Sequence, residues 1–181
     1  MRQNLDLPTV VVYGFGMWTS QGVRDQVFSY EQFRAVTELS KKEADGWTKS
    51  GIIRAELSAN GRRRLYRFEA MMEGIIAKQL ADFSSRELLA NMMKSLRQFL
   101  KEQRIDLSKI SSDPEGPRVL VRIHTQRSKE IMPGGGVRGV ITYVSLFDPS
   151  SQLIQKGVFL VVDLTMIAVH AISAVGRLSA V

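Results

Sequence analysis

The pattern of apolar and polar positions predicts helices in the first hundred residues and strands after residue 117. Apolar residues recur at helical spacing over residues 68–80 and again over 85–101, which predicts two successive helices. Three β-branched runs, RVLVRIHT, VRGVITYVSLF and VFLVVDL, predict strands, with turns at MPGGG and DPSSQ between them. Residues 165–178 are apolar at helical spacing and predict a last helix.

Two shorter helices are predicted ahead of residue 52 by capping boxes. Ser29, with Gln32 three residues later, opens the stretch SYEQFRAVTEL. Ser40, with Glu43 three residues later, opens SKKEADGWTKSG, and Gly51 supplies a left-handed cap at the end of that helix. Two short helices joined by so short a turn are typical of a helix-turn-helix.

The segment IIRAELSANGRRRLYRF predicts two short strands joined at Asn60-Gly61, a dipeptide preferred in hairpin turns. A hairpin directly after a helix-turn-helix is a wing. This wing is strongly basic, since Glu56 is the one acid among the arginines Arg54, Arg62, Arg63, Arg64 and Arg67. Because side chains alternate along a strand, we expect Arg62 and Arg64 to share the face offered to phosphates. Arg63 is then free to pair internally; a solvated, salt-bridged hairpin is the alternative interpretation.

The breaker-rich stretch SSDPEGPR predicts a linker, with a domain boundary near residues 110–117. We therefore expect an α+β protein with an extension over residues 1–27. A winged helix-turn-helix with added helices follows over residues 28–110. We expect residues 117–181 to form a small β-rich C-terminal domain that ends in a helix. This domain would bind an effector or mediate oligomerisation. Within the extension, TVVVYGFGMW is compatible with a strand and a glycine turn.

Charge and composition narrow the function classes. The net charge of +7 and the pI of about 9.9 favour a polyanionic partner, either nucleic acid or an anionic membrane. The most apolar region, residues 157–181, is interrupted by charged residues, so we expect no membrane span there, and we expect no secretory signal in the first residues.

The chain offers little chemistry for a metal site or for catalysis. It has no cysteine and two histidines far apart in sequence, which argues against a metal site and fits a reducing compartment. No nucleophile–base constellation is present. We therefore expect a cytoplasmic, nucleoid-associated protein that is not an enzyme and has no catalytic residues, no metal and no cofactor.

Four segments follow one another in a recognisable order: FSYEQFRAVTEL, SKKEADGW, SGII and NGRRRLYRFEAM. In this order and spacing, residues 28 to about 99 resemble the MerR-like winged helix-turn-helix family. The resemblance implies a homodimeric, sequence-specific transcription regulator with its recognition helix in the major groove and its wing on the phosphates. Together, the resemblance and the local charge give as candidate DNA-binding residues Lys41, Lys42, Trp47, Lys49, Arg54, Arg62, Arg63, Arg64, Tyr66 and Arg67. Trp47 and Tyr66 are of types that more often pack in a core than stack on bases.

The sequence departs from the family pattern inside the recognition helix. ADGWT stands where the family often has Leu-Arg-Tyr-Tyr-Glu, so that Asp45 is expected to repel phosphate. Gly46 weakens the helix by about 1 kcal/mol relative to alanine. Glu38 stands where a turn glycine is usual. These changes leave the base specificity open and the wing intact.

Two further functions stay open, and so does the partner of the C-terminal domain in a regulator. One is an architectural, partition or recombination directionality protein that bends DNA, which a weak recognition helix beside a strong wing favours. Another is an antitoxin-like autoregulator whose C-terminal domain binds a partner protein. The same domain could instead hold a small-molecule effector of a regulator.

Overall fold

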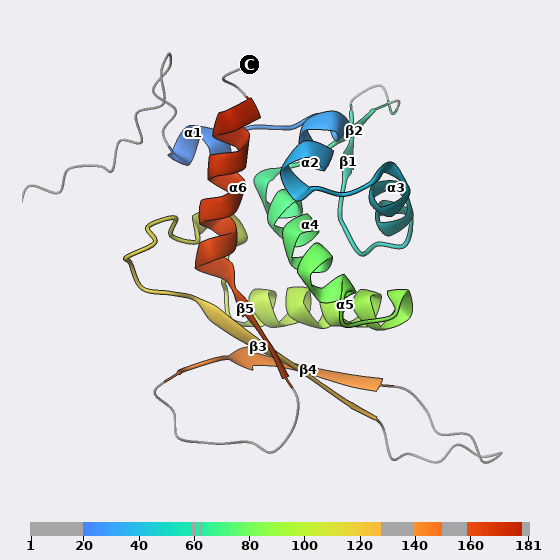
Figure 1. Cartoon of the computed structure of the whole chain (residues 1–181), viewed down its shortest axis with the longest axis vertical. Coiled ribbons are helices and arrows are strands. Elements are labelled where there is room, and N and C mark those ends of the chain that lie inside the picture. Colours follow the sequence, from blue (N-terminus) through green and yellow to red (C-terminus); the bar gives the residue numbers. More distant parts are fainter. Residues whose placement is uncertain (1–19, 59–60, 62, 128–139, 150–158, 179–181) are drawn as a thin grey trace, which may run out of the picture.

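The computed structural model describes residues 20–58, 61, 63–127, 140–149 and 159–178. They form a mixed α+β structure (Figure 1). Its elements are α1 (Ser20–Arg24), α2 (Tyr30–Thr37), α3 (Lys41–Lys49), β1 (Glu56–Leu57), β2 (Arg64–Leu65), α4 (Phe68–Ala81), α5 (Arg86–Glu102), the 3-10 turn η1 (Leu107–Lys109), β3 (Leu120–Arg127), β4 (Val140–Leu146), β5 (Phe159–Asp163) and α6 (Leu164–Leu178). The strand predicted within residues 1–27 and the MPGGG turn lie outside the described residues.

Both predicted capping boxes are present. The Gln32 amide donates to Ser29 Oγ (3.3 Å), and the Ser29 amide donates to Gln32 Oε1 (2.9 Å). At α3 the corresponding bonds between Ser40 and Glu43 are 3.2 and 2.8 Å long. Glu38 ends α2 in the left-handed region, with a φ of 56°, where a non-glycine residue is strained. The two helix starts that the sequence predicts are therefore confirmed. They could be predicted because each depends on two residues only three positions apart.

Helix α4 lies against α2 at a point where a glycine is required. A Cβ at Gly74 would lie 2.6 Å from Thr37 Cγ2 and 3.1 Å from the ring of Phe33. The absence of a side chain therefore lets the two helices approach closely. Phe33 in turn stacks on Tyr66, with ring centroids 4.0 Å apart. The α2–α4 crossing and the hairpin thus share one packed aromatic pair.

The hairpin β1–β2 is short and antiparallel, with Glu56 opposite Leu65 and Leu57 opposite Arg64. Gly61 lies in its turn with a φ of 67°, as the predicted Asn-Gly turn requires. The hairpin is fixed to the segment before α2, since Phe28 and Tyr66 exchange backbone hydrogen bonds of 2.8 and 3.0 Å. It therefore sits beside the α2–α3 pair (Figure 1).

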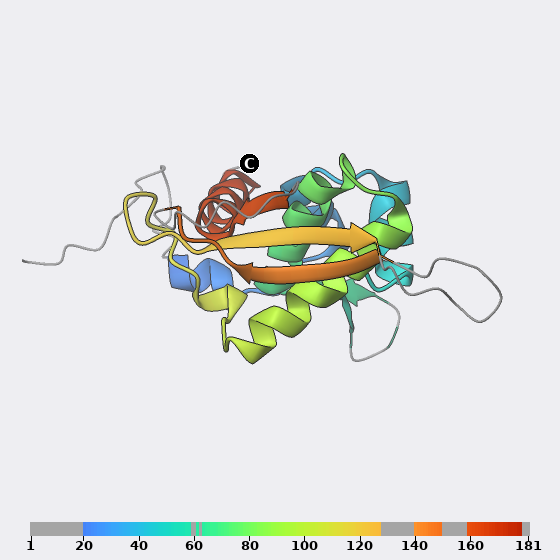
Figure 2. The ribbon, with the colours of Figure 1, turned by 90° about the horizontal axis from the view of Figure 1, so that it is seen from below.

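The second sheet has the order β4-β3-β5 and is antiparallel throughout. Its inner face packs on the helices through the buried side chains of Val121, Ile123 and Val162. Helix α6 follows β5 directly and begins at Leu164, and the carboxylate of Asp163, just before the helix, accepts from the Met166 amide (3.0 Å). Seen from below, β3 and β4 cross in front of the helices (Figure 2).

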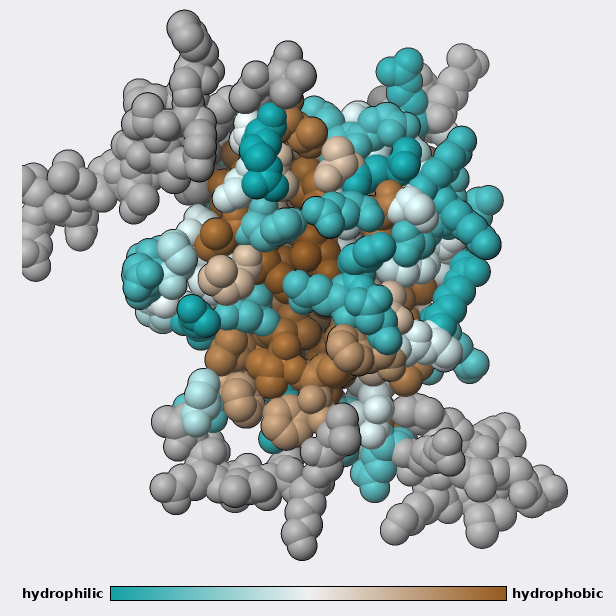
Figure 3. Space-filling view, in the orientation of Figure 1, coloured by the Kyte–Doolittle hydropathy of each residue, from teal (hydrophilic) through white to brown (hydrophobic). Residues whose placement is uncertain are grey.

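The two parts of the sequence do not pack as separate units. Helix α6 contacts α1, α2 and α4, and β4 contacts α5. One hydrophobic cluster includes buried residues from both sides of residues 110–117. The described residues after 117 therefore pack on the same hydrophobic core as the helices before residue 110. Figure 3 shows apolar residues continuing down the middle of the molecule between these elements.

Helix α1 is anchored through Arg24. Its guanidinium donates to the backbone carbonyls of Ser108 and Ile110 and lies over the ring of Phe68, 5.4 Å from its centroid. Burial lowers the pKa of Arg24 below its ordinary value. Within the described part of the chain, no helix has the length and apolar character needed to cross a membrane.

A buried carboxylate joins α3, α4 and α5. The side chain of Glu73 on α4 is 2% exposed and accepts hydrogen bonds from the guanidinium groups of Arg54 and Arg97. Arg97 on α5 also donates to the carbonyls of Gly51, at 2.8 Å, and Ile52. The segment that leaves α3 is thereby held against both later helices.

We expect Gly74→Ala to lower the free energy of unfolding by about 1–3 kcal/mol, because the added methyl group overpacks the α2–α4 crossing. Urea denaturation followed by circular dichroism measures the change. Gly176→Ala in α6 is the matched control, since a Cβ there meets nothing within 4 Å. That variant should be neutral or stabilised by up to about 1 kcal/mol. Equal effects at both positions would contradict the close approach at Gly74.

We expect Glu73→Gln to cost about 3 kcal/mol, because it leaves the Arg97 guanidinium half-buried without a counter-charge. Glu69→Gln, one turn earlier on α4, removes the same charge from a more accessible position and should change stability by less than about 0.5 kcal/mol. The same denaturation measurement applies. A small effect at Glu73 would show that the cluster does not hold the helices together.

Candidate nucleic-acid interface

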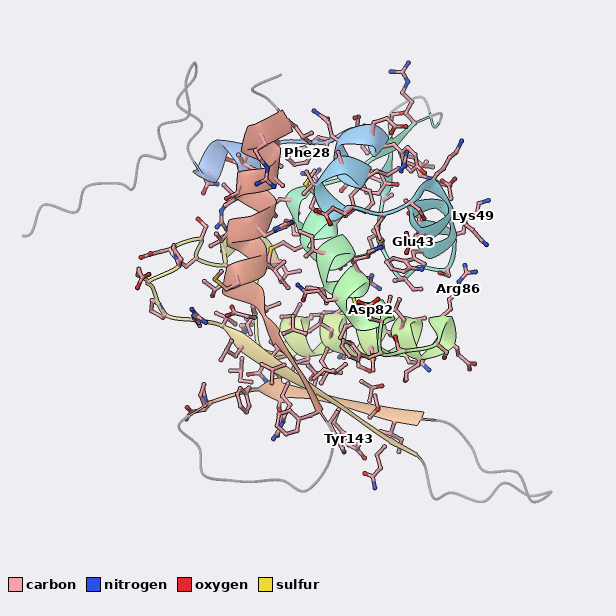
Figure 4. The ribbon with its side chains drawn as sticks, in the orientation of Figure 1. Phe28, Glu43, Lys49, Asp82, Arg86 and Tyr143 are labelled. Atoms are coloured by element: carbon pink, nitrogen blue, oxygen red, sulfur yellow. The ribbon has the colours of Figure 1, made fainter. Side chains whose placement is uncertain are left out.

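The outward face of α3 is basic. Ala44 and Trp47 are buried and fix which side of the helix faces the core. Lys41, Lys42 and Lys49 are exposed. Lys42 and Lys49 are seven residues apart, so they share one face two turns apart. Figure 4 shows Lys49 pointing away from the body of the molecule.

Helix α3 carries two carboxylates, and the first of them, Glu43, lies at the helix start. Glu43 closes the capping box and also accepts from Lys78 Nζ at 3.3 Å. The hydrogen bond with Ser40 lowers the pKa of Glu43 below its ordinary value, and Lys78 adds to the effect. Its charge is thus compensated on the side of the helix toward α4.

Asp45 does not stand free on the outward face. Arg64 of β2 donates to its Oδ1 at 2.8 Å, which joins α3 to the hairpin. Desolvation opposes ionisation of Asp45, but hydrogen bonds from Tyr30 and Arg64 outweigh it and hold its pKa below the usual value. The expected repulsion between Asp45 and phosphate is therefore offset by a neighbouring cation.

This pairing reverses the predicted roles of two arginines. Arg64, expected to face a phosphate, is 29% exposed and is held by Asp45. Arg63, expected to pair internally, is exposed, and the described residues offer it no ion-pair partner. Arg64 points to the side of the hairpin on which α3 lies. Arg62 lies outside the described residues.

The remaining arginines of the hairpin region are also paired. The side chain of Arg54 is 65% exposed although its guanidinium reaches Glu73 at 2.6 Å. Two arginines share the Glu73 carboxylate, so this cluster keeps a net positive charge. Arg67 pairs with Glu56 at 2.7 Å, and that hydrogen bond holds the pKa of Arg67 above its ordinary value. The salt-bridged interpretation of the hairpin thus holds for Arg54, Arg64 and Arg67.

Trp47 and Tyr66 lie in the core and do not reach a surface where bases could stack. Tyr66 is completely buried between the hairpin and α2, against Phe33. Its hydroxyl has no hydrogen-bond partner among the described residues. The core interpretation of both side chains therefore applies, and neither contributes to the candidate interface.

The structure adds one residue to the candidate interface that the sequence analysis did not identify. Arg86, the first residue of α5, donates from Nη2 to the Gly46 carbonyl at 2.7 Å. A Cβ at Gly46 would lie 3.6 Å from the same nitrogen, which is ordinary van der Waals contact, so the guanidinium packs directly beside α3. Figure 4 shows Arg86 next to the helix. The two residues are forty positions apart in sequence, and no local pattern connects them.

Five exposed cations around α3 and the hairpin then have no ion-pair partner in the described part of the chain: Lys41, Lys42, Lys49, Arg63 and Arg86. Such groups neutralise phosphates and release bound counterions. For a metal, the described residues offer no cluster of three or more His, Asp or Glu side chains. The arrangement suits a polyanion better than a small ligand that must be enclosed.

No protein-family model matches the chain, and no curated protein matches it either. The resemblance of residues 28–99 to the MerR-like family therefore stays a prediction that rests on the order and spacing of its segments. The candidate interface is defined by its geometry: a capped helix with a lysine face, a hairpin fixed beside it, and an arginine from α5.

Proposed function

We propose that this protein binds double-stranded DNA as a homodimeric, sequence-specific transcription regulator in the cytoplasm. In this proposal α3 is the recognition helix of a winged helix-turn-helix and β1–β2 is its wing. Helix α3 enters the major groove, and the hairpin lies on the phosphate backbone. A second copy reads the other half of a two-fold symmetric site, one helical turn away.

The observation that carries the proposal is the outward face of α3. It carries exposed lysines two turns apart, and the one carboxylate on that face, Asp45, is compensated by Arg64. Arg63 and Arg86 extend the positive surface to the hairpin and to α5. A net charge of +7 supports the same partner, because long-range attraction steers association with DNA.

One observation favours a second candidate, a DNA-architectural or partition protein. The outward face of α3 offers lysines and a glycine, and its one acid is held by Arg64. Lysine binds phosphate as a point charge, whereas the bidentate pairs that read bases come from Arg, Asn and Gln. A protein with such a helix would bind many sequences and depend more on DNA shape.

We expect Lys42→Ala combined with Lys49→Ala to weaken duplex binding. Because each phosphate contact contributes roughly 0.9 to the slope of log K against log salt, the double variant should lose about two units of slope. Fluorescence anisotropy of a labelled random duplex across a salt series measures this. Lys94→Ala with Lys101→Ala on α5 makes the same charge change and should leave the slope nearly unchanged.

Absence of duplex binding by the wild-type protein at low salt would refute the proposed function. If the wild type binds and both double variants lose the same slope, the interface lies elsewhere on the surface. Selection of preferred sequences from a random pool then separates the two candidates, since a regulator enriches one site and an architectural protein enriches none strongly.

We expect Asp45→Asn to tighten duplex binding several-fold and to raise the salt slope by about one unit, because it removes a negative charge and releases Arg64 toward the phosphates. The anisotropy titration described above detects this. Glu102→Gln at the end of α5 removes the same charge far from α3 and should change the affinity little. Weaker binding by Asp45→Asn would mean that the Asp45–Arg64 pair orders the interface.

A further inference from the structure

The outer face of the sheet β4-β3-β5 carries a row of ring side chains. His124 of β3 lies opposite Tyr143 on β4 and opposite Phe159 on β5, so the three residues form one row across the strands. The rings of His124 and Tyr143 are stacked, with centroids 6.3 Å apart and an interplanar angle of 26°. Because Val121 and Ile123 point into the core, His124 and its row point outward.

These rings are open to solvent. Tyr143 is 52% exposed and Phe159 is 37% exposed. Ile141 and Val161, in the flanking positions of the same face, are also exposed. Single exposed apolar side chains need no explanation, but a continuous apolar row is typical of a binding surface. Figure 4 places Tyr143 at the sheet end of the molecule, away from Lys49 and Arg86.

One arginine of this face, Arg122, has no ion-pair partner among the described residues. Arg122, in the row next to the rings, lies over the Phe159 ring at 5.7 Å from its centroid and donates to Ser145 Oγ at 3.3 Å. Among the described outward positions of the three strands, Asp163 is the one acid. Its carboxylate is held by Arg118 at 3.4 Å and by the Met166 amide at the start of α6. No other carboxylate of the described strands opposes a polyanion there.

We propose that this face binds single-stranded nucleic acid, with unpaired bases stacked on the Tyr143–His124–Phe159 row and Arg122 near the backbone. Every base has a π-face, so stacking on aromatic side chains is tolerant of sequence. Neighbouring strands lie about 4.8 Å apart, which presents the rings to successive bases. A duplex cannot use the row, because its bases are already stacked on each other.

The test uses the full chain and a labelled oligo(dT) strand, with an oligo(U) strand to separate DNA from RNA. The variant Tyr143→Leu keeps apolar bulk and removes the ring. We expect it to bind either strand about 5- to 100-fold more weakly, the range that loss of one stacked base gives. Tyr143→Phe keeps the ring and should bind like the wild type. Ile141→Ala is the control for loss of apolar area on the same strand.

The same experiment tests whether this site acts independently of the duplex surface. Lys42→Ala with Lys49→Ala should lose duplex affinity while retaining the sensitivity of single-strand binding to Tyr143→Leu. Unchanged oligo(dT) and oligo(U) binding by a folded Tyr143→Leu protein, verified by circular dichroism, overturns the proposal. So does a self-association that Tyr143→Leu abolishes in sedimentation, because the row is then an interface between copies.

Discussion

The carboxylate of Glu73 is the interaction on which the arrangement of the N-terminal helices depends. It is buried, so its charge is tolerated only because Arg54 and Arg97 both donate to it. Arg97 reaches past the carboxylate to the carbonyls of Gly51 and Ile52, which lie directly after α3. One charged group therefore fixes where α3 ends relative to α4 and α5. A lysine in place of Arg97 could not serve all these acceptors, because it lacks the planar fork of donors.

The orientation of α3 then decides which charges reach the surface. With Trp47 and Ala44 facing the core, Asp45 faces the hairpin and captures Arg64. Glu43 faces α4 and captures Lys78. Both acids of α3 are thus compensated by cations from other elements, and the lysines of its outward face are left uncompensated within the described residues. The positive charge of this surface thus depends on the ion pairs that neutralise Glu43 and Asp45 as much as on the number of lysines and arginines.

The sequence predicted what depends on near neighbours and failed where distant residues meet. Capping boxes at Ser29 and Ser40 involve residues three apart, and the strands and helices follow from local periodicity. The Asp45–Arg64 pair joins residues nineteen apart, and the Gly46–Arg86 hydrogen bond joins residues forty apart, so neither has a local signature. The core shared by the two parts of the chain has no local signature either, since a linker rich in breakers says nothing about where the following strands pack.

The two surfaces differ in the balance of charge and stacking, and this sets how each responds to salt. Around α3, five exposed cations dominate the surface, so association there should depend steeply on ionic strength. On the sheet, Arg122 is the arginine that accompanies the ring row, and it already lies over Phe159. Stacking depends little on salt, so binding to the sheet should persist where binding to α3 is lost. A chain with both surfaces would hold a single strand at one end under conditions that release a duplex from the other.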